Sequence, residues 1–517
     1  MKVRKDYIST ILKYVYLLSF VYIYLVAIFY VKGEICGISY PFVFIGTLVF
    51  TIAVIYLISK VKKKNILGNK DAVRKENMAL IIVSVLLFFI QIIIVWNVIF
   101  RTSWDPGAVW YGAHYVSQGN IAGIEEMAYY FSIYPNNLLL VFIYSVLLRM
   151  NDLVGTPISN GIIILAVFQC VLITMAGVLL FQCAKRFVET RVAWVAYAFY
   201  FILVGISPWI MIPYSDSSGL IFPIALLYLY IRFKEVEDIK KKTLTIFSMV
   251  VLGYIGYYIK PMAVIVLIAI ACIEITEFIR GLVEKREVEI KRLGIYFVTI
   301  IIGLILSVIL GTTAVQSMNF PVVTDIVLGG PYHILLGLNT DTNGGYNQED
   351  FDFATSFATG EEMSQAVTQE ILNRIKEFGV TGLGEHFVKK SARTFYDGTM
   401  GWGGGETFYT EIFPQRAGKL CPLLRAIYYD NSQGYLYEYH AFLRQILWFA
   451  VLIGSLFAVG IKENMNTQKK VLVLSVLGLM LFIMVFEAHA RYVFTFVPIY
   501  IVLAVIGFGS IFGKFRK

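Results

Sequence analysis

Two acidic residues stand where a long hydrophobic run of the chain gives way to a polar segment. Asp105 lies in the Ser-Trp-Asp-Pro-Gly motif at 103–107, which opens the polar and aromatic segment 100–150, and Asp216 lies in the Ser-Asp-Ser motif at 215–217. A carboxylate in such a position can deprotonate or orient an attacking hydroxyl, and two carboxylates can share this work or hold a divalent metal. Both motifs also fit a structural interpretation, because Asp-Pro-Gly is a turn sequence and Ser-Asp-Ser starts helices.

Two basic residues stand at comparable boundaries. Lys260 separates two apolar runs and precedes a proline, and Arg491 comes at the start of the last apolar run. A lysine ammonium is a compact point charge for a phosphate, and an arginine offers a bidentate fork to phosphate oxygens. The alternative for Lys260 is a side chain that extends along apolar surface to reach water. Two cations and two acids around one cavity would suit a substrate that carries both phosphate and hydroxyl groups.

Neutral polar residues follow Asp105 in the same segment. A Tyr-Pro-Asn-Asn motif supplies Tyr134, Asn136 and Asn137, which can hydrogen-bond a sugar or a lipid headgroup or can simply start a helix. His114 lies on the amphipathic stretch 108–118, where an interfacial histidine is the alternative to a substrate contact. The five cysteines show no metal-type spacing, and the chain has no zinc-type histidine motif, Walker loop or dinucleotide-binding glycine motif.

The composition indicates that membrane helices position these residues. The 517 residues are 58% hydrophobic and only 15% charged, with a mean hydropathy of +0.71, whereas soluble domains are about a quarter charged. The net charge of +9, from 44 Lys and Arg against 35 Asp and Glu, is typical of the positive-inside bias of membrane proteins. The lipid bilayer is therefore an expected partner. Nucleic acid is not, since no dense basic patch with stacking residues occurs.

The apolar runs define the expected fold. A spanning helix needs about 20 mainly apolar residues, and we predict an all-α integral membrane protein, a polytopic helical bundle of about twelve spans. The predicted spans are 10–31, 41–59, 79–100, 158–182, 192–212, 217–232, 243–259, 261–279, 294–312, 442–461, 470–486 and 492–512.

The segment 135–150 has too short an apolar part to be a clear span, and charge decides its placement. If it does not span, the basic N-terminus and every later basic segment lie on one side of the membrane, as the positive-inside rule requires. These segments are 60–64, 185–191, 232–242, 280–292, 462–470 and 514–517. We therefore predict that 135–150 is a juxtamembrane helix and that both termini are cytoplasmic. Asp105, Asp216, Lys260 and Arg491 are then extracytoplasmic, on the outer face of a cell membrane.

These assignments divide the chain into four parts. They are 1–78, with two transmembrane helices and a basic cytoplasmic loop; 79–312, a transmembrane core with the first outer loop 101–157; 313–441, a small extracytoplasmic subdomain; and 442–517, the C-terminal transmembrane helices. Within the subdomain we predict helices over 361–378 and about 382–395, since Gly379 is a helix stop signal. The glycine-rich segment 401–406 must be a loop.

The layout resembles the GT-C superfamily of membrane glycosyltransferases, and in particular its protein-mannosyltransferase and aminoarabinose-transferase-like group, glycosyltransferase family 39. The residues that carry the resemblance are Trp104-Asp105, the motif at 134–137, Lys185-Arg186-Phe187, the segment 212–216, Arg491-Tyr492 and Pro498. Phrases at 337–339, 344–347 and 404–406 are similar to outer loops of Gram-positive members of this kind. The match covers about 79–310 and the C-terminal helices. In two respects the chain departs from the pattern: Pro-Gly rather than Glu follows Asp105, and two extra helices precede the core.

The resemblance implies an activity and a role for each candidate residue. The protein would transfer a sugar from a polyprenyl-phosphate donor to a hydroxyl of a cell-envelope glycan, glycolipid or protein. Asp105 would be the general base and Asp216 a second acid near the reacting centre, while Lys260 and Arg491 would hold the lipid phosphate. Further substrate contacts are expected from Tyr134, Asn136, Asn137, His114 and Glu406. No cofactor is implied with certainty, and a requirement for a divalent metal stays open.

Three other functions remain open at this point. A lipid-linked sugar flippase or transporter would place polar residues mid-membrane on broken helices. An envelope polysaccharide polymerase or ligase would use arginines and a histidine of the large outer loop, for which Arg393, Arg416 and His386 are available. A non-catalytic scaffold would not depend on Asp105.

Overall fold

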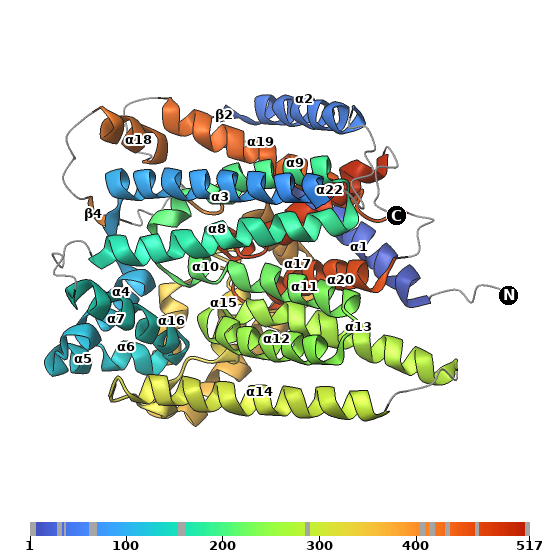
Figure 1. Cartoon of the computed structure of the whole chain (residues 1–517). Coiled ribbons are helices and arrows are strands. Elements are labelled where there is room, and N and C mark those ends of the chain that lie inside the picture. Colours follow the sequence, from blue (N-terminus) through green and yellow to red (C-terminus); the bar gives the residue numbers. More distant parts are fainter. Residues whose placement is uncertain are drawn as a thin grey trace.

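The computed structural model describes residues 7–27, 34–35, 38–60, 70–153, 161–284, 290–402, 409–412, 419–429, 435–460 and 465–511. Long helices run side by side through the molecule (Figure 1). They are α1 (Tyr7–Leu25), α2 (Tyr40–Ser59), α3 (Lys70–Val98), α8 (Gly161–Phe187), α9 (Thr190–Tyr200), α11 (Ile221–Glu235), α12 (Ile239–Ile259), α13 (Val264–Val283), α14 (Ile290–Gln316), α19 (Leu436–Leu456), α20 (Thr467–Val485) and α22 (Val497–Ile511).

Other helices and two short sheets complete the described fold. The helices are α4 (Trp104–Gln118), α5 (Ile121–Glu126), α6 (Ala128–Ile133), α7 (Leu138–Leu153), α10 (Ser215–Ser218), α15 (Gly330–Gly337), α16 (Gln348–Thr355), α17 (Gly360–Phe395), α18 (Leu420–Tyr428) and α21 (Ala490–Phe494). Strand β1 (Glu34–Ile35) pairs antiparallel with β2 (Ile38–Ser39), and β3 (Phe100–Thr102) pairs antiparallel with β4 (Tyr409–Ile412).

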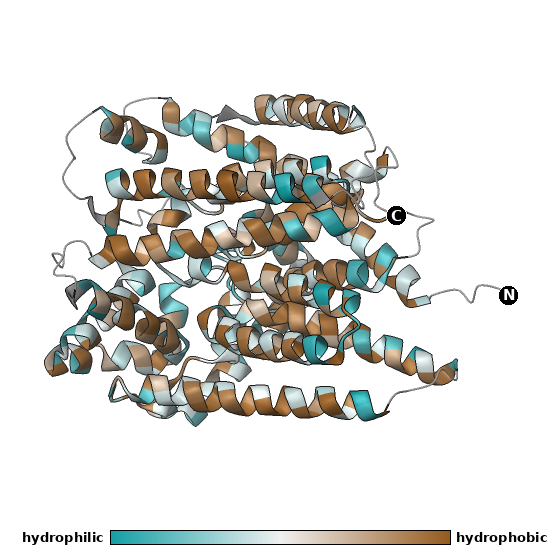
Figure 2. Ribbon diagram, in the orientation of Figure 1, coloured by the Kyte–Doolittle hydropathy of each residue, from teal (hydrophilic) through white to brown (hydrophobic). Residues whose placement is uncertain are grey.

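The helices have the length and composition of membrane spans. Among the described residues, 10 helices are long and apolar enough to cross a membrane, and two shorter apolar helices cover Thr190–Gly205 and Val497–Ile511. Hydrophobic residues follow the length of the helices while hydrophilic ones concentrate towards their ends (Figure 2). The protein is therefore an all-α integral membrane protein, as predicted. The predicted span 192–212 is wrong at its end, because regular helix stops at Tyr200 and a π-helical turn, Phe201–Gly205, follows.

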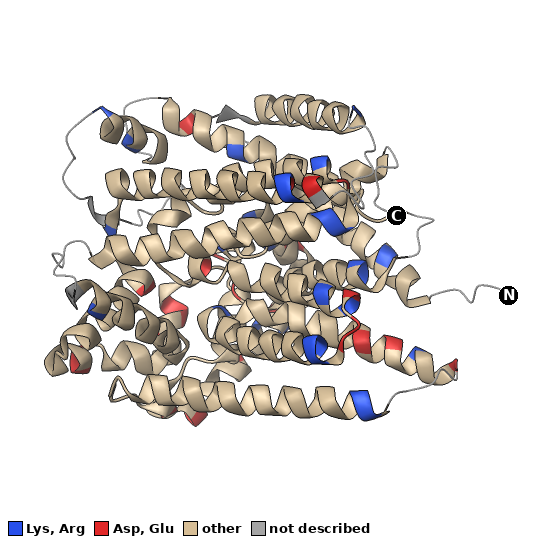
Figure 3. Ribbon diagram, viewed as in Figure 1, with Lys and Arg blue, Asp and Glu red and all other residues tan. Residues whose placement is uncertain are grey.

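Ion pairs gather the starts and ends of many long helices at one end of the bundle, which we call the basic end. Its pairs are Lys185–Glu76, Arg186–Glu235, Lys234–Glu274 and Lys470–Glu277. Lys and Arg are concentrated towards this end in Figure 3. We call the opposite end the loop end, where α4, α5, α6, α7 and α18 lie (Figure 1).

The segment between α3 and α8 makes no net crossing of the bundle. Lys185, near the end of α8, pairs with Glu76, near the start of α3, so these two helices are antiparallel. The end of α3 and the start of α8 therefore both lie at the loop end, together with α7 between them. This is the arrangement that a juxtamembrane placement of 135–150 requires.

The two N-terminal helices are integral to the bundle. Tyr16 of α1 is fully buried and its hydroxyl donates a hydrogen bond to the carbonyl oxygen of Ser455 on α19, at 2.7 Å. The C-terminal helices α19 and α22 pack closely at a pair of glycines, since a Cβ on Gly507 would lie 1.8 Å from the carbonyl oxygen of Gly454. Small residues permit such close approach of membrane helices.

Helices α15, α16 and α17 form a small unit at the loop end, which we call the loop-end subdomain. It has a hydrophobic cluster of its own, built around Tyr332, Leu335 and Val367. The prediction of two helices separated at Gly379 is confirmed, because α17 is interrupted there by a residue with φ of 56° and ψ of −171°. Inside the predicted loop 401–406, Gly401 and Trp402 form a turn, and the other residues lie outside the described part of the chain.

Candidate functional site

The backbone after α9 is irregular and buried, and it carries two residues of the site. After the π-helical turn come a 3₁₀ turn at Pro208–Met211, the short helix α10 and then α11. The backbone lies against Gln169, which is eight residues into α8 and hence about 12 Å from the start of that helix. Irregular backbone at such depth must find hydrogen-bond partners within the protein.

Side chains from neighbouring helices provide those partners. Gln169 Nε2 donates to the carbonyl oxygens of Trp209 and Ile210, at 3.1 and 3.2 Å, and its Oε1 accepts from the backbone N–H of Tyr214, at 3.3 Å. Ser217 Oγ donates to the Trp209 carbonyl at 2.8 Å. The segment that leads into α10 is thereby fixed, and with it the position of Tyr214.

The interrupted segment from α9 to α11 is called the broken span here, and two more side chains support its backbone. Arg444 of α19, fully buried, donates to the carbonyl oxygens of Ile202 and Leu203, both at 2.9 Å, and to Ser207 Oγ at 3.2 Å. Gln91 Nε2 of α3 donates to the Gly205 carbonyl at 2.8 Å. The carbonyl groups that the break releases from helical bonding are thus satisfied by charged and amide groups.

Asp105 is positioned by a tight turn from β3 into α4. Ser103 is the N-cap residue of α4 and its side chain makes no capping hydrogen bond, while Asp105 lies in the first helical turn. Gly107 permits the turn, because a Cβ there would lie 2.7 Å from the Thr102 carbonyl oxygen. The turn expected from Asp-Pro-Gly is present, but Asp105 is not the N-cap residue of α4 and its carboxylate has other partners.

Those partners are two tyrosine hydroxyls. Tyr130 donates to Asp105 Oδ1 at 2.9 Å and Tyr214 donates to Asp105 Oδ2 at 3.2 Å. Asn137 Nδ2 donates in turn to the Tyr130 hydroxyl at 2.9 Å. Burial and the charge of Asp105 raise the pKa of both tyrosine hydroxyls, which therefore stay protonated as donors. Asn137 Oδ1 is buried and has no hydrogen-bond partner within the described chain.

Asp216 and Lys260 form a buried ion pair. Lys260 Nζ lies 2.5 Å from Asp216 Oδ1, and the side chains are 11% and 1% exposed. The ammonium also lies 4.6 Å from the ring centroid of Tyr492, a cation–π contact. Neither oxygen of Asp216 has a partner with hydrogen-bond geometry among the described residues. The two candidates predicted separately as an acid and a phosphate contact thus meet each other.

Arg491 lies on α21, next to this pair. Its guanidinium carbon is 5.5 Å from the Tyr492 ring centroid, and its Nε is buried without a hydrogen-bond partner in the part of the chain described. Burial lowers the pKa of Arg491, but the charges of Tyr492, Asp216 and Glu487 outweigh this and raise the pKa above its ordinary value, so the guanidinium is charged. With Lys260 engaged by Asp216, Arg491 is the cation with donor capacity to spare.

Glu487 is a third carboxylate of the site. Its side chain is 11% exposed, and Oε2 lies 3.6 Å from His333 Nδ1 of the loop-end subdomain. Burial raises the pKa of Glu487, but His333, Arg491 and Tyr492 outweigh this and lower it to about 2. Sequence reasoning did not single it out, although it follows an apolar run in the same way as Asp105 follows one.

Three tyrosines, Tyr134, Tyr332 and Tyr346, lie within range of the charges or rings of the site. The pKa of Tyr134 is raised by burial and then by Asp105, and the pKa of Tyr332 is raised by burial and then by Tyr134. Burial, Asp352, Asp105 and Glu487 raise the pKa of Tyr346. The predicted Tyr134 therefore lies close to Asp105. Tyr332 had no signal in the sequence beyond residue type, and Tyr346 was marked only by its place in the segment 344–347, which resembles family outer loops.

Two other predicted substrate contacts, Asn136 and His114, do not contact Asp105. Asn136 is exposed. His114 lies nine residues along α4 from Asp105, about 13 Å by helical rise, and stacks on Trp110 with ring centroids 5.3 Å apart. Glu406 and Arg416 lie outside the described residues.

Two residues proposed for a polymerase or ligase instead support the loop-end subdomain. His386 Nε2 is 2.9 Å from the Gly337 carbonyl oxygen. Arg393 Nη1 donates to the Thr342 carbonyl at 2.8 Å. Both side chains therefore bind backbone carbonyl groups at turns of this unit.

The acids of the site do not form a metal-binding set. Within the described ranges, no three His, Cys, Asp or Glu side chains are grouped so as to hold a metal ion. Asp216 is paired with Lys260 and Glu487 with His333. Asp105 is bound by two tyrosine hydroxyls, which leaves the cluster better suited to hydrogen bonding and to an anionic ligand than to a cation.

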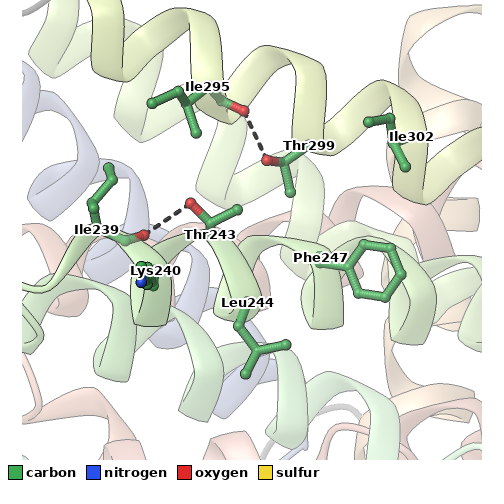
Figure 4. Close-up of a pocket in the computed structure, with 8 residues that line it drawn as sticks. All are labelled: Ile239, Lys240, Thr243, Leu244, Phe247, Ile295, Thr299 and Ile302. Atoms are coloured by element: carbon green, nitrogen blue, oxygen red, sulfur yellow. Dashed lines mark hydrogen bonds between the residues drawn. The ribbon is translucent and has the colours of Figure 1, made fainter.

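A groove lies between α12 and α14 (Figure 4). It includes Ile239 and Lys240 at the start of α12, close in sequence to Glu235, so it lies towards the basic end. Its volume is about 540 Å³, and it is lined by Ile239, Lys240, Thr243, Leu244, Phe247, Ile295, Thr299 and Ile302. The two threonine hydroxyls donate to carbonyl oxygens of their own helices, at 2.8 and 2.7 Å. The groove therefore presents mainly hydrocarbon, and it holds none of the predicted site residues.

The fold and the site together define a polytopic α-helical membrane protein with a polar cluster at the loop end. We use the name polar cluster for Asp105, Tyr130, Asn137, Tyr214, Asp216, Lys260, Glu487, Arg491 and Tyr492. The chain belongs to the family described as conserved hypothetical integral membrane proteins, which matches residues 1–511. No curated protein matches the sequence.

Proposed function

We propose that the protein is a membrane glycosyltransferase that moves a sugar from a polyprenyl-phosphate donor to a hydroxyl group of a cell-envelope acceptor. The supporting observation is a set of buried, unpartnered polar atoms in the polar cluster. Among the described residues, Asn137 Oδ1 is an acceptor without a donor and Arg491 Nε is a donor without an acceptor, while the Asp216 carboxylate has the Lys260 ammonium beside it but no contact with hydrogen-bond geometry. A ligand that combines hydroxyl groups with an anionic phosphate supplies both kinds of missing partner.

The geometry suggests a role for each part. Asp105 is only partly buried and its carboxylate is oriented by Tyr130 and Tyr214, so it can accept the proton of an attacking hydroxyl. Arg491 offers its guanidinium to the phosphate that leaves, which stabilises the charge developing on that group. Lys260 is paired with Asp216, so it contributes positive potential rather than a free ammonium.

The topology we propose places this reaction outside the cell. The basic end, with its Lys and Arg clusters, lies in the cytoplasm by the positive-inside rule. The loop end, with the polar cluster, then faces the outer surface of the cell membrane. A long isoprenoid tail would remain in the bilayer while its phosphate reaches Arg491.

A transporter of lipid-linked sugars is the second candidate, and the broken span favours it, because interrupted helices are typical of transport sites. In this protein, however, Gln169, Arg444 and Gln91 bind the backbone carbonyls of the break. They are therefore engaged in supporting the chain. The unpartnered atoms of Asn137 and Arg491, which support the transferase, lie in the polar cluster at the loop end.

The decisive experiment substitutes Asp105→Asn in the native host and compares envelope glycans by mass spectrometry with wild type and a deletion. We expect the variant to lose the same sugar decoration as the deletion, since a lost general base costs about 10²–10⁴ in rate. Asp341→Asn, an exposed acid of the loop-end subdomain, is the matched control and should behave like wild type. Membrane levels of all proteins must be equal. An Asp105→Asn strain with wild-type glycans would reject the proposal.

A second arm separates transfer from transport. Purified protein in detergent is mixed with the lipid fraction of the deletion strain, where no membrane separates two compartments. A glycosyltransferase still forms product under these conditions, whereas a transporter has nothing to move. Absence of product, with protein that is shown to be folded, would favour transport.

A further inference from the structure

Trp104 has a backbone conformation that a bulky residue rarely adopts. Its φ is 59°, in the left-handed region that favours glycine and asparagine. The residue sits between Ser103, which is extended, and the regular turn of α4. A glycine here would follow the same path without strain, so the presence of Trp costs stability. Strain of this kind concentrates at functional sites.

The Trp104 side chain is exposed although it is large and apolar. It is 45% exposed and directly precedes Asp105, whose carboxylate is held by Tyr130 and Tyr214. Almost half of the Trp104 surface therefore stays uncovered in the folded protein, at the residue that carries the strain. A ligand that covers the ring when it binds beside Asp105 would account for both features.

A second exposed aromatic side chain approaches Asp105 from the loop-end subdomain. Tyr346 is 49% exposed and its hydroxyl donates to Gln348 Oε1 at 2.7 Å. Burial and Asp352 raise the pKa of Tyr346, and the charges of Asp105 and Glu487 raise it further. The turn that carries Tyr346 also contacts the polar cluster, because the carbonyl oxygen of Gly344 accepts a hydrogen bond from the backbone N–H of Ala488, the residue after Glu487, at 2.7 Å.

We propose that Trp104 and Tyr346 bind the pyranose ring of the acceptor, which is therefore a glycan. This inference rests on the proposed glycosyl transfer. The face of an aromatic ring carries partial negative charge and attracts the polarised C–H groups on the face of a sugar. Serine or threonine of a protein acceptor offers no such face.

The reaction at this site balances without a further reactant. The acceptor O–H oxygen forms a bond to the anomeric carbon of the donor sugar, and its proton passes to Asp105. The bond between that carbon and the phosphate oxygen breaks, and its electron pair leaves with the polyprenyl phosphate beside Arg491. The aromatic side chains take no part in bond making and act by holding the acceptor.

The test uses membranes of the deletion strain as the source of donor and acceptor, titrated against purified variants. Trp104→Gly should raise the apparent KM about tenfold while kcat changes less than twofold, because an aromatic contact is lost. Its thermal midpoint should not fall, because glycine relieves the strain. Trp104→Phe, which keeps an aromatic face, should stay within threefold of wild type. Tyr346→Ala, at an exposed position, should raise KM without unfolding the protein.

The outcomes separate this inference from the proposed function. An unchanged KM for Trp104→Gly and Tyr346→Ala, with Asp105→Asn inactive, would overturn the aromatic platform and leave the transferase intact. A fall in the Trp104→Gly midpoint with unchanged KM would show that the ring only anchors the protein in the interface. An active Asp105→Asn variant would reject the transferase itself. The product should carry the new sugar on a sugar hydroxyl, and attachment to a peptide would contradict a glycan acceptor.

Discussion

Both ends of the helical bundle carry acidic and basic side chains, but the pairing and the burial of these side chains differ between the two ends. At the basic end, charges meet in pairs that join neighbouring helices, such as Lys234–Glu274 at 2.8 Å and Arg186–Glu235 at 3.2 Å. At the loop end, Asp216 and Lys260 are more deeply buried than these two pairs, and the surrounding polar atoms are incompletely satisfied. Figure 3 shows charged residues at both ends, so the presence of charge alone does not mark a site.

What distinguishes the two ends is how many buried polar atoms lack a hydrogen-bond partner. Among the ion-paired residues of the basic end this holds for Arg186 Nε, whereas in the polar cluster it holds for Asn137 Oδ1, both carboxylate oxygens of Asp216 and Arg491 Nε. Paired, partly exposed charges hold helices in register and contribute little when solvent screens them. Buried atoms without partners cost free energy that folding must recover elsewhere. Those on Asn137, Asp216 and Arg491 lie in one cluster with the oriented carboxylate of Asp105, as the proposed ligand site requires. Three substitutions test this difference, from the largest expected effect to the smallest.

The largest effect is expected from Lys260→Met. It leaves the buried carboxylate of Asp216 without its counter-ion, and breaking a buried pair in this way costs about 3 kcal/mol or more. The free energy of unfolding, measured in detergent, should fall by that amount. The double variant Lys260→Met with Asp216→Asn removes both charges and should recover most of the loss. A double variant as unstable as the single one would show that the pair is not coupled.

An intermediate effect, dependent on pH, is expected from Lys390 of α17. Its ammonium is buried and donates to the carbonyl oxygens of Gly337 and Met484, at 2.8 and 3.0 Å. Burial lowers the pKa of Lys390 from 10.5 to about 7, and Glu487 raises it only in part. Between pH 7 and 10.5 the unfolded chain therefore binds more protons than the folded one, and stability rises with pH by up to about 1.4 kcal/mol per unit.

Lys390→Met should remove this slope. Thermal midpoints of wild type and variant between pH 7 and 9 provide the measurement, with Lys389→Met, a half-exposed neighbour in an ion pair with Glu385, as the control that keeps the slope. Parallel profiles for wild type and Lys390→Met would show that Lys390 titrates normally.

The smallest effect is expected at the basic end. Lys234→Met removes the pair with Glu274, and because the two side chains are 27% and 35% exposed the remaining carboxylate can regain water. We expect a loss of about 1 kcal/mol in unfolding free energy and no change in envelope glycans. A loss as large as that of Lys260→Met, or a change in glycans, would contradict the distinction between the two ends.

The sequence was sufficient for the elements that depend on local pattern. Apolar runs gave the long helices, and Gly379 marked the break in α17, because hydrophobic length and glycine conformation act within a few residues. The candidates Asp105, Asp216, Lys260 and Arg491 were also recognisable, since each interrupts or borders an apolar run. Their assignment to one end follows from the number of helices between them.

Contacts between distant segments were beyond such reasoning. The pairing of Asp216 with Lys260 joins residues on different helices, and Tyr130 and Tyr214 are two among 34 tyrosines. The span predicted at 192–212 failed because hydropathy does not register a break in hydrogen bonding. Pro208 within that run is the local signal that could have been given more weight.

The support of the broken span has a consequence for how the protein is made. The carbonyls of Ile202 and Leu203 depend on Arg444, which is synthesised about 240 residues later. Until α19 has entered the membrane, the nascent chain carries exposed peptide groups in lipid. We therefore expect a chain truncated before residue 444 to be a substrate for membrane quality control. The earlier helices complete their hydrogen bonding only after the C-terminal helices have been inserted.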